Sequence, residues 1–347
     1  MKQRTIEIIS IRSVQELKRL RDRYKTYRFE DLYDEMEEKY RIIRSPELYF
    51  LKEVVKQRKK TKHYITEGKW IIYHSKKSVR HLLNKPDYMD FRTTRNRNLI
   101  NYEEQKILYE KKILVIGLSV GSQVINTLIR TGIGNDYIIA DGDTVEVSNF
   151  NRTNFNLEDL GSLKVDVVEK YALEIDPYLR ITKVKKYLGD RDFRKLLKNI
   201  DLVVDSFDNF PMKILLRKIA KKMSIPVISG FDVSRGSMVI LERYDKEKDL
   251  DISFYLNGYR EEDLQHLKDK TIEEKTNLFI KIIGEKYHDD RMLESVYSVG
   301  KSLTGYPQMA ISTNLTGALW TTGVIDLFLN KKSTSKRCFI SLDDVLK

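Results

Sequence analysis

The sequence contains very little cysteine, proline or histidine, and it has no long apolar run. Its 347 residues include one cysteine, six prolines and five histidines. The lone cysteine, Cys338, excludes an internal disulfide and any Cys₄ zinc site, and the histidines show no metal-ligand spacing. No apolar run approaches the roughly 18 residues that a membrane-spanning helix needs. We therefore expect neither a zinc centre nor a membrane span.

The first residues also lack the apolar stretch of a secretory signal, so we expect a cytoplasmic protein. A content of 41% hydrophobic residues supports a full core, and the length is sufficient for one large domain with an appendage. No internal repeat or low-complexity linker is visible. We predict a basic N-terminal α+β domain at residues 1–90 and a second domain at residues 91–347.

Positive charge is concentrated at the N-terminal end. Residues 1–100 contain 26 Lys and Arg against 14 Asp and Glu, and their net charge of +12 equals that of the whole chain. This region either attracts an acidic or carboxylate-bearing partner or serves only as a solvated surface. Its basic run, with Lys56, Arg58, Lys59, Lys60 and Lys62 as candidate contacts, contains no aromatic residue. Nucleic acid is therefore the less favoured partner.

The chain is organised around residues 111–152. An apolar run rich in β-branched residues at 111–116 predicts a buried strand. A turn, Gly117-Leu-Ser-Val-Gly121, and an apolar helical pattern follow, and a second strand at 136–140 ends on Asp141-Gly-Asp143. This order is typical of a nucleotide-binding unit. The turn lets backbone N–H groups approach phosphate at a helix N-terminus, and the acid after the second strand can accept hydrogen bonds from a ribose.

The turn departs from Gly-x-Gly-x-x-Gly, because Ser119 and Ser122 stand where the second and third glycines are expected. Alone, this pattern is also typical of an ordinary strand-to-helix turn. The rest of the second domain predicts a Rossmann-like α/β fold with a mainly parallel sheet and right-handed crossovers. The expected strands are residues 181–184, 202–205 and 226–229, with antiparallel edge strands at 236–242 and 337–341. The expected helices are 163–175, 193–197, 212–223 and 310–329, with a helical insertion at about 250–305.

In the N-terminal domain, helical spacing of Leu, Ile and Tyr predicts helices at residues 16–28 and 29–43. Residues 70–73 predict a strand, and residues 78–83 predict a short helix or turn. Cys338 falls in the last predicted strand, where we expect a small buried hydrophobe.

Linked motifs beyond the first turn carry a family resemblance. They are Asp141-Gly-Asp143-Thr-Val-Glu-Val-Ser-Asn149-Phe-Asn-Arg152, Gly161-Ser-Leu-Lys164 and Asp205-Ser-Phe-Asp208-Asn209. Over roughly residues 90–345 the chain resembles the ThiF/MoeB superfamily, the adenylyltransferases related to ubiquitin-activating enzymes. The resemblance implies an enzyme that uses ATP and Mg²⁺ to adenylate a carboxylate of a peptide, carrier protein or ubiquitin-like protein. The Ser119 turn is similar to that of a bacterial subgroup, some of whose members are joined to a nitroreductase-like domain.

The resemblance also implies roles for single residues. Gly117, Ser119 and Gly121 would form the phosphate turn, Asp141 would hold the ribose hydroxyls, and Asp143 is the next acid of the same loop. Asn149, Arg152 and Lys164 match positions that contact ATP phosphates, and Asp208 matches the acid that binds Mg²⁺. Arg97 matches an arginine that enters the ATP site of a partner subunit, which implies a homodimer. The superfamily's usual catalytic cysteine and zinc-binding cysteines are missing from the insertion.

Each matched residue also has a structural interpretation. Lys164 suits a solvated helix face, Arg152 a structural ion pair, Asp208 a helix N-cap and Arg97 a basic helix start. Two other functions share the fold, an NAD(P)-dependent oxidoreductase and a non-catalytic peptide-binding module. With no cysteine placed for a thioester, we expect an external amine, thiol or sulfide, or the substrate's own amide, to attack the adenylate.

Overall fold

The computed structural model describes residues 5–45, 64–264 and 270–345. The chain divides into two compact units. The first comprises Met1–Gln105 with Lys170–Leu179, and the second comprises Lys106–Glu169 with Arg180–Lys347. The basic run at residues 56–62 lies outside the described residues. No helix within the described ranges is both long and apolar enough to cross a membrane.

The first unit is built on a four-stranded sheet with the order β1-β3-β4-β2. Its elements are β1 (Ile6–Ile9), α1 (Val14–Arg23), β2 (Arg28–Asp31), α2 (Tyr33–Arg44), β3 (Lys69–Tyr73), β4 (Ser78–Leu82) and α4 (Lys85–Arg92). Trp70 of β3 is 1% exposed and belongs to a cluster with apolar residues of α1. The Ser13 side chain caps α1 by accepting a hydrogen bond from the N–H of Glu16 at 3.2 Å.

The prediction for residues 70–73 is confirmed, but two others in this unit are wrong. Residues 28–31 form a strand rather than the junction of two helices, because β2 pairs in parallel with β4. Residues 78–82 form β4 itself, since its Cα atoms pair with both β2 and β3. Both corrections come from pairing between segments far apart in the sequence, which local helical spacing does not reveal.

The second unit contains an eight-stranded sheet. Its strands are β5 (Lys112–Ile116), β6 (Asp136–Ala140), β7 (Arg180–Val184), β8 (Leu202–Asp205), β9 (Val227–Ser229), β10 (Asp232–Val233), β11 (Gly236–Glu242) and β12 (Lys336–Ser341). Strands β9, β8, β5, β6 and β7 are neighbours in that order and run parallel. β10 continues the line of β9 along one side of β11, and β12 pairs with the other side. The predicted mainly parallel sheet is confirmed.

Two predictions about the antiparallel strands need correction. β11 is an interior strand, because it has neighbours on both sides and every one of its residues is buried. Only β12 forms the edge at this side of the sheet. Cys338 does lie in β12, but its side chain is exposed rather than buried. Side chains alternate between the two faces of a strand, and on this edge strand Cys338 and Ile340 are the exposed pair.

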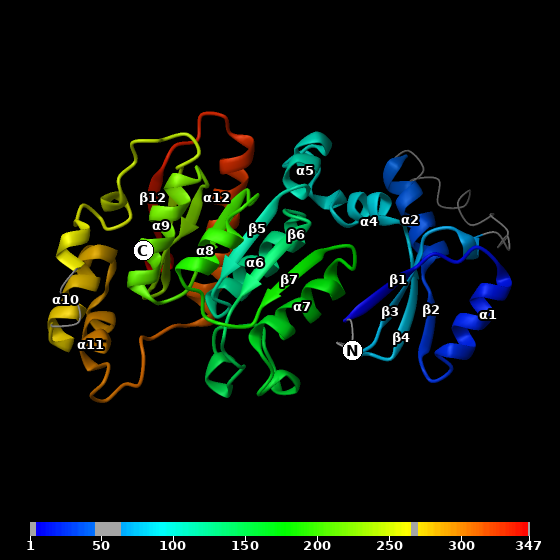
Figure 1. Cartoon of the computed structure of the whole chain (residues 1–347), viewed down its shortest axis with the longest axis horizontal. Coiled ribbons are helices and arrows are strands. Elements are labelled where there is room, and N and C mark those ends of the chain that lie inside the picture. The colour runs from blue at the N-terminus through cyan, green and yellow to red at the C-terminus, as the bar shows by residue number, and fades with distance from the viewer. Residues whose placement is uncertain (1–4, 46–63, 265–269, 346–347) are drawn as a thin grey trace. The chain divides into compact units, whose positions relative to one another are not determined.

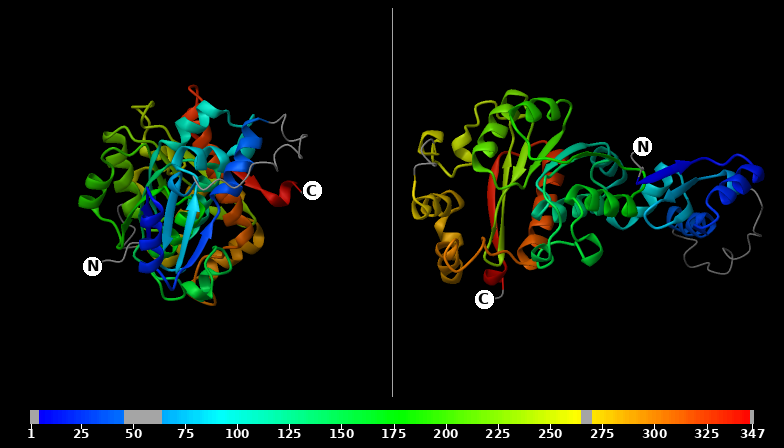
Figure 2. Two further views of the ribbon diagram at one scale, coloured as in Figure 1. Left: turned by 90° about the vertical axis from the view of Figure 1, so that its right-hand side faces the viewer. Right: turned by 60° about the horizontal axis from the view of Figure 1, so that its bottom comes forward.

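Helices cover both faces of the large sheet, as Figures 1 and 2 show. The helices from residue 102 onward, whether or not they cover the sheet, are α5 (Tyr102–Tyr109), α6 (Val120–Thr131), α7 (Lys164–Ile175), α8 (Asp190–Leu196), α9 (Phe210–Lys222), α10 (Ile272–Ile283), α11 (Asp290–Ser298), α12 (Ala310–Leu329) and the short α13 (Leu342–Val345). α6 packs against α12, while α8 and α9 share a core with β5 and β8. The predicted insertion contains α10 and α11, which pack near β11 and β12.

Candidate functional site

Two adjoining cavities lie where the parallel strands β5, β6 and β8 end. Because β5 leads to β6 on one side and β8 lies on its other side, this is the switch point at which open α/β sheets bind ligands. One cavity, of about 370 Å³, is lined mainly by apolar side chains. The other, of about 480 Å³, is lined mainly by polar ones. They share five lining residues, which are Ser119, Asp143, Lys164, Ser206 and Asp208.

The turn after β5 brings the backbone close to the loop after β8. Gly117 has φ +83°, and a Cβ there would lie 2.6 Å from the carbonyl oxygen of Ser206. A Cβ on Gly121 would collide with the Ser206 side chain. Glycine is therefore required at both positions, but Gly121 serves packing and does not line either cavity.

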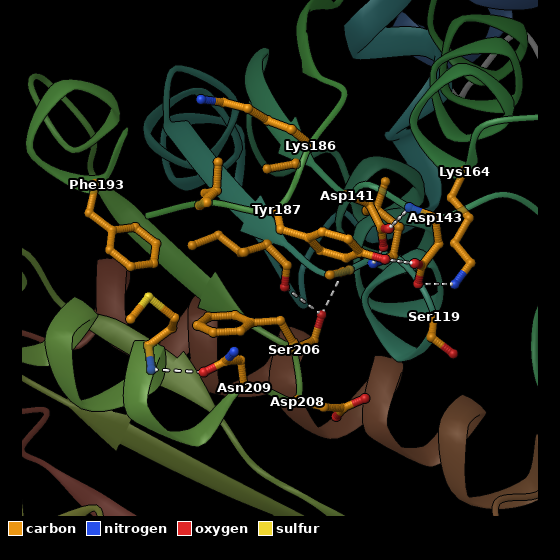
Figure 3. Close-up of a pocket in the computed structure, with 17 residues that line it drawn as sticks. Ser119, Asp141, Asp143, Lys164, Lys186, Tyr187, Phe193, Ser206, Asp208 and Asn209 are labelled. Carbon is orange, nitrogen blue, oxygen red and sulfur yellow. Dashed lines mark hydrogen bonds and ion pairs between the residues drawn. The ribbon is translucent and has the colours of Figure 1, made fainter. Parts of the chain in front are cut away.

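Ser119 stands at the N-terminus of α6, where its side chain caps no backbone group. Its Oγ atom is buried and has no hydrogen-bond partner among the described residues. The side chain lines both cavities (Figure 3). An unpartnered donor beside the positive end of a helix suits an anionic group such as phosphate.

Asp141 and Asp143 have different surroundings although they follow the same strand. Asp141 is 8% exposed and accepts hydrogen bonds from the backbone N–H groups of Leu118 at 2.6 Å and Asp143 at 2.7 Å. Burial raises the pKa of Asp141. Burial would also raise the pKa of Asp143, but hydrogen bonds from Tyr187 and Lys164 outweigh it and lower that pKa. Asp141 therefore shapes the turn, while the Asp143 side chain, 45% exposed, is the more accessible acid.

Lys164 does not lie on a solvated helix face. Its side chain is 7% exposed, and Nζ lies 3.0 Å from Oδ2 of Asp143. The Tyr187 hydroxyl donates to the other oxygen, Oδ1, of the same carboxylate. That hydrogen bond raises the pKa of Tyr187. Figure 3 shows the three side chains meeting beside Ser119.

The polar cavity also contains Asn149 and Arg152. Asn149 is buried and its Oδ1 atom accepts from the backbone N–H of Glu146 at 3.1 Å. Arg152 Nη1 donates to the carbonyl oxygen of Ser148 at 2.6 Å, and its Nε atom is buried without a hydrogen-bond partner among the described residues. These contacts hold the guanidinium through carbonyl groups, and no salt bridge of Arg152 occurs in the described parts of the chain.

Asp208 is exposed and lines both cavities. It is not the N-cap of α9, because Asn209 takes that position and accepts from the N–H of Met212 at 3.1 Å. Within the described ranges no group of three or more His, Cys, Asp or Glu residues could hold a metal. A Mg²⁺ ion at Asp208 would therefore need phosphate and water oxygens as its other ligands, as is common for this ion.

A buried ionic network supports the loop that bears Asp208. Asp205, at the end of β8, accepts from Lys213 Nζ and from Arg217 Nη1, both at 2.7 Å. Arg217 also contacts Glu242 of β11 at 2.9 Å and is fully buried. The network joins β8, α9 and β11 directly beneath the loop, so the loop starts from a fixed point.

Asp232 was not predicted from the sequence. It lies on β10, is 7% exposed, and accepts from the Thr316 hydroxyl and from Gln308 Nε2, the latter at 3.4 Å. Burial, together with the nearby charge of Asp208, raises the pKa of Asp232 to about 6. Gln308 lines the polar cavity, whereas Asp232 does not. Asp232 comes three residues after the end of β9, whereas Asp141 directly follows β6, so the only available sequence signal was an acid shortly after a buried strand.

Tyr187 and Gln308 are further lining residues that sequence reasoning missed. Of the predicted set, the structure groups eight residues around the two cavities: Gly117, Ser119, Asp141, Asp143, Asn149, Arg152, Lys164 and Asp208. Arg97 belongs to the first unit, where its Nη2 atom lies 2.7 Å from Oδ1 of Asp90.

Comparison with known proteins adds a family match. A model described as ThiF family matches residues 93–342. The uncharacterized protein MT1398 of Mycobacterium tuberculosis is 30% identical over 242 residues, which make up 70% of this chain and 33% of that protein. The sulfur carrier protein adenylyltransferase of Thermus thermophilus is 31% identical over 130 residues, 37% of this chain and 48% of that protein. The chain thus spans about a third of one relative and about half of the other.

Among solved structures, PaaA has a similar fold. The match has a TM-score of 0.52 and 17% identity, and it covers 74% of this chain and 68% of PaaA. At this level of identity the likeness concerns the fold, a mixed α/β architecture with a large, mainly parallel sheet.

Proposed function

The chain belongs to the ThiF family, and from this premise we propose that it is an ATP-dependent adenylyltransferase that activates a carboxylate. The observation that carries the proposal is the grouping of Ser119, Arg152, Lys164 and Asp208 around the cavities at the N-terminus of α6. An NAD(P)-dependent oxidoreductase would leave the two cations and Asp208 without a task. A non-catalytic binding module would have no need of all three.

We assign the triphosphate to the polar cavity. Two cationic side chains, Lys164 and Arg152, and the first turn of α6 would bind its oxygens. The same cavity also carries the carboxylates of Asp143, Glu146 and Asp208, which outnumber the cations. ATP would therefore bind as its Mg²⁺ complex, with Asp208 as the protein ligand, and the ion would neutralise charge on the leaving phosphates.

In the reaction that we propose, a carboxylate oxygen of the substrate attacks the α-phosphorus of ATP. A new C–O–P linkage forms while the bond to the oxygen that bridges the α- and β-phosphates breaks, and pyrophosphate leaves with that electron pair. No proton transfer is required. The task of the protein is to hold three anionic groups in line and to stabilise the charge that develops between them. Lys164 must shift from Asp143 toward phosphate to contribute.

A second copy of the chain is part of the proposal. α12 carries only one charged residue, Asp326, over its twenty positions, and Ile311 near its start is 48% exposed. Its exposed positions are uncharged, and an uncharged outer face suits a helix covered by a partner. In a homodimer Arg97 would serve the partner's phosphate site, after exchanging Asp90 for phosphate or while keeping one contact to it.

We propose a peptide or a small carrier or ubiquitin-like protein as the substrate, since one relative is named for a sulfur carrier protein. The N-terminal unit, with the chain's excess positive charge, would attract such a partner if it is acidic. Deleting the N-terminal part of this unit is a poor test of this role, because it would remove partners of the segment Lys170–Leu179. In that segment the Tyr178 hydroxyl donates to the carbonyl of Leu83, and Asp176 accepts from Arg92. Replacing Lys59 and Lys60 with Glu should instead weaken substrate binding and flatten its salt dependence.

We also propose that no cysteine relays the acyl group. Cys338, the only one in the chain, lies on the edge strand β12, away from the lining of both cavities. The adenylate would react directly with an external nucleophile or with the substrate's own amide. On its Gly-Leu-Ser-Val-Gly turn we place the chain in the subgroup whose members are sometimes joined to a nitroreductase-like domain.

The test of the proposed function is ATP–pyrophosphate exchange. Radioactive pyrophosphate should enter ATP only when a substrate carboxylate and Mg²⁺ are present, and candidate peptides can be screened on this basis. Asp208→Asn should abolish the exchange and leave the fold intact, because the side chain is exposed. Glu158→Gln, an exposed acid outside both cavities, is the matched control. Exchange at the wild-type rate in Asp208→Asn would rule out Asp208 as the metal ligand.

A further inference from the structure

Tyr187 occupies an unusual place at the end of β7. Its side chain is largely exposed, with 74% of the residue accessible, yet it is held at two points. The ring lies against Gly142, where a Cβ would come within 3.1 Å of it, and the hydroxyl donates to Asp143. Figure 3 shows the side chain reaching toward Asp143 from the β7 side of the cavity. The ring and the hydroxyl of this exposed tyrosine are both held in place, so its free ring face is oriented to contact a bound ligand.

The apolar cavity has the lining of a site for a flat ring. Its apolar walls come from Leu118, Leu188, Phe193, Phe207 and Met212. The polar cavity beside it holds the cations that suit phosphate. Tyr187 lines only the apolar cavity, but through its hydroxyl it contacts Asp143, which lines both. Tyr187 therefore joins the apolar cavity to the charged groups of the site, as Figure 3 shows.

We propose that Tyr187 is a binding and positioning residue of the nucleotide site. Its ring forms a wall of the base slot, and its hydroxyl positions Asp143 and, through it, Lys164. This inference rests on the proposed function, because it takes the two cavities as the base and phosphate parts of one ATP site. Aromatic faces stack on bases with little dependence on sequence, so the ring supplies affinity for the base.

The hydroxyl acts on the phosphate part of the site. Asp143 accepts a hydrogen bond from the Tyr187 hydroxyl at Oδ1 and one from Lys164 Nζ at Oδ2. The hydroxyl therefore offsets part of the negative charge of the carboxylate. Without it, Asp143 would hold Lys164 more firmly, and Lys164 would be less free to bind phosphate. The ring and the hydroxyl thus have separable effects.

The experiment compares three proteins by calorimetric titration in Mg²⁺ with ATP, AMP and tripolyphosphate. Tyr187→Phe removes only the hydroxyl, and Tyr187→Leu removes the ring as well. From wild type to Phe, affinity for ATP and for tripolyphosphate should fall together, by about threefold. From Phe to Leu, affinity for ATP and AMP should fall about tenfold, while affinity for tripolyphosphate stays unchanged. A structural defect would not separate the ligands in this way.

Tyr297→Leu is the matched control, because Tyr297 is also exposed, at 40%, and also bonds through its hydroxyl, to Asn277 at 2.6 Å. It should change no affinity. Equal ATP affinity in Tyr187→Phe and Tyr187→Leu would overturn the role of the ring, and wild-type tripolyphosphate affinity in Tyr187→Phe would overturn the role of the hydroxyl. Both results leave ATP binding by the wild type in place. A wild-type protein that binds no ATP would instead refute the proposed function and this inference with it.

Discussion

Replacing Asp232 with Asn should stabilise the second unit at neutral pH. Asp232 is 7% exposed and its hydrogen bonds come from Thr316 and Gln308. An Asn side chain has nearly the same shape, so its oxygen can still accept from the Thr316 hydroxyl. Its NH₂ group can donate to Gln308 once that amide turns over, which keeps every polar group paired. The substitution therefore removes a buried charge without leaving a cavity.

The size of the effect follows from the pKa. Burial raises the pKa of Asp232 from 3.8 to about 6, a difference that corresponds to about 3 kcal/mol. Below pH 3.8 both the folded and the unfolded chain carry the proton, and the charge costs nothing. As the pH rises from 3.8 to about 6, Asp232 ionises in the unfolded chain but keeps its proton in the folded chain, so the cost to folding grows. Above about 6 the full cost applies. Asp232→Asn should gain about 3 kcal/mol at pH 7.5 and only about 1 kcal/mol at pH 4.5.

Urea unfolding followed by tryptophan fluorescence measures this gain. Trp320 belongs to the second unit and is buried, with its indole N–H donating to the carbonyl of Met238 at 2.8 Å. Making both proteins in a Trp70→Phe background leaves Trp320 as the only reporter. Glu158→Gln, at an exposed acid, is the control and should change stability by no more than about 0.5 kcal/mol. A gain that does not depend on pH, or a loss at pH 7.5, would refute the reasoning.

Three further predictions concern the core, the assembly and the cysteine. Arg217→Met should cost at least about 3 kcal/mol of unfolding free energy in a urea titration, because it leaves the buried Glu242 without its cation and Asp205 with Lys213 alone. Lys218→Met, at the exposed neighbour, is the control, and similar losses in both would contradict this. Arg97→Ala and Lys164→Ala should each abolish pyrophosphate exchange and partly restore it when mixed, whereas a fully active monomer in light scattering would show that no subunit is shared. Cys338→Ser should leave exchange and product formation unchanged, and a reducible covalent adduct lost in this variant would show that the thiol takes part.

The sequence predicted best where local pattern and topology agree. The apolar runs of β5, β6 and β8 are buried central strands, so continuous hydrophobicity identified them without reference to neighbours. The residues that follow these strands then had to meet at one edge of the sheet, and Asp141 and Asp208 do line the same cavity. Helices α7 and α12 were also predicted within one residue of their observed ends.

The failures arose where distant pairing or burial decides the outcome. β4 carries Arg80 and His81 and looks polar, but it becomes a strand because it has partners on both sides. Alternation in β11 suggested an edge, although β12 covers that side from almost a hundred residues away. Asp232 accepts a hydrogen bond from Thr316 of α12, and the hydrogen bond from Tyr187 to Asp143 joins the loops that follow two neighbouring strands. None of these contacts leaves a mark on local periodicity.

The central claim is that the cavities beside α6 bind ATP with Mg²⁺, and the most direct test is a calorimetric comparison of ATP and NAD as ligands of the wild-type protein. The account predicts that ATP binds more tightly than NAD, that EDTA removes most of its affinity, and that Asp208→Asn makes the remaining affinity insensitive to Mg²⁺. Tighter binding of NAD, or ATP binding that is indifferent to both Mg²⁺ and Asp208, would contradict it.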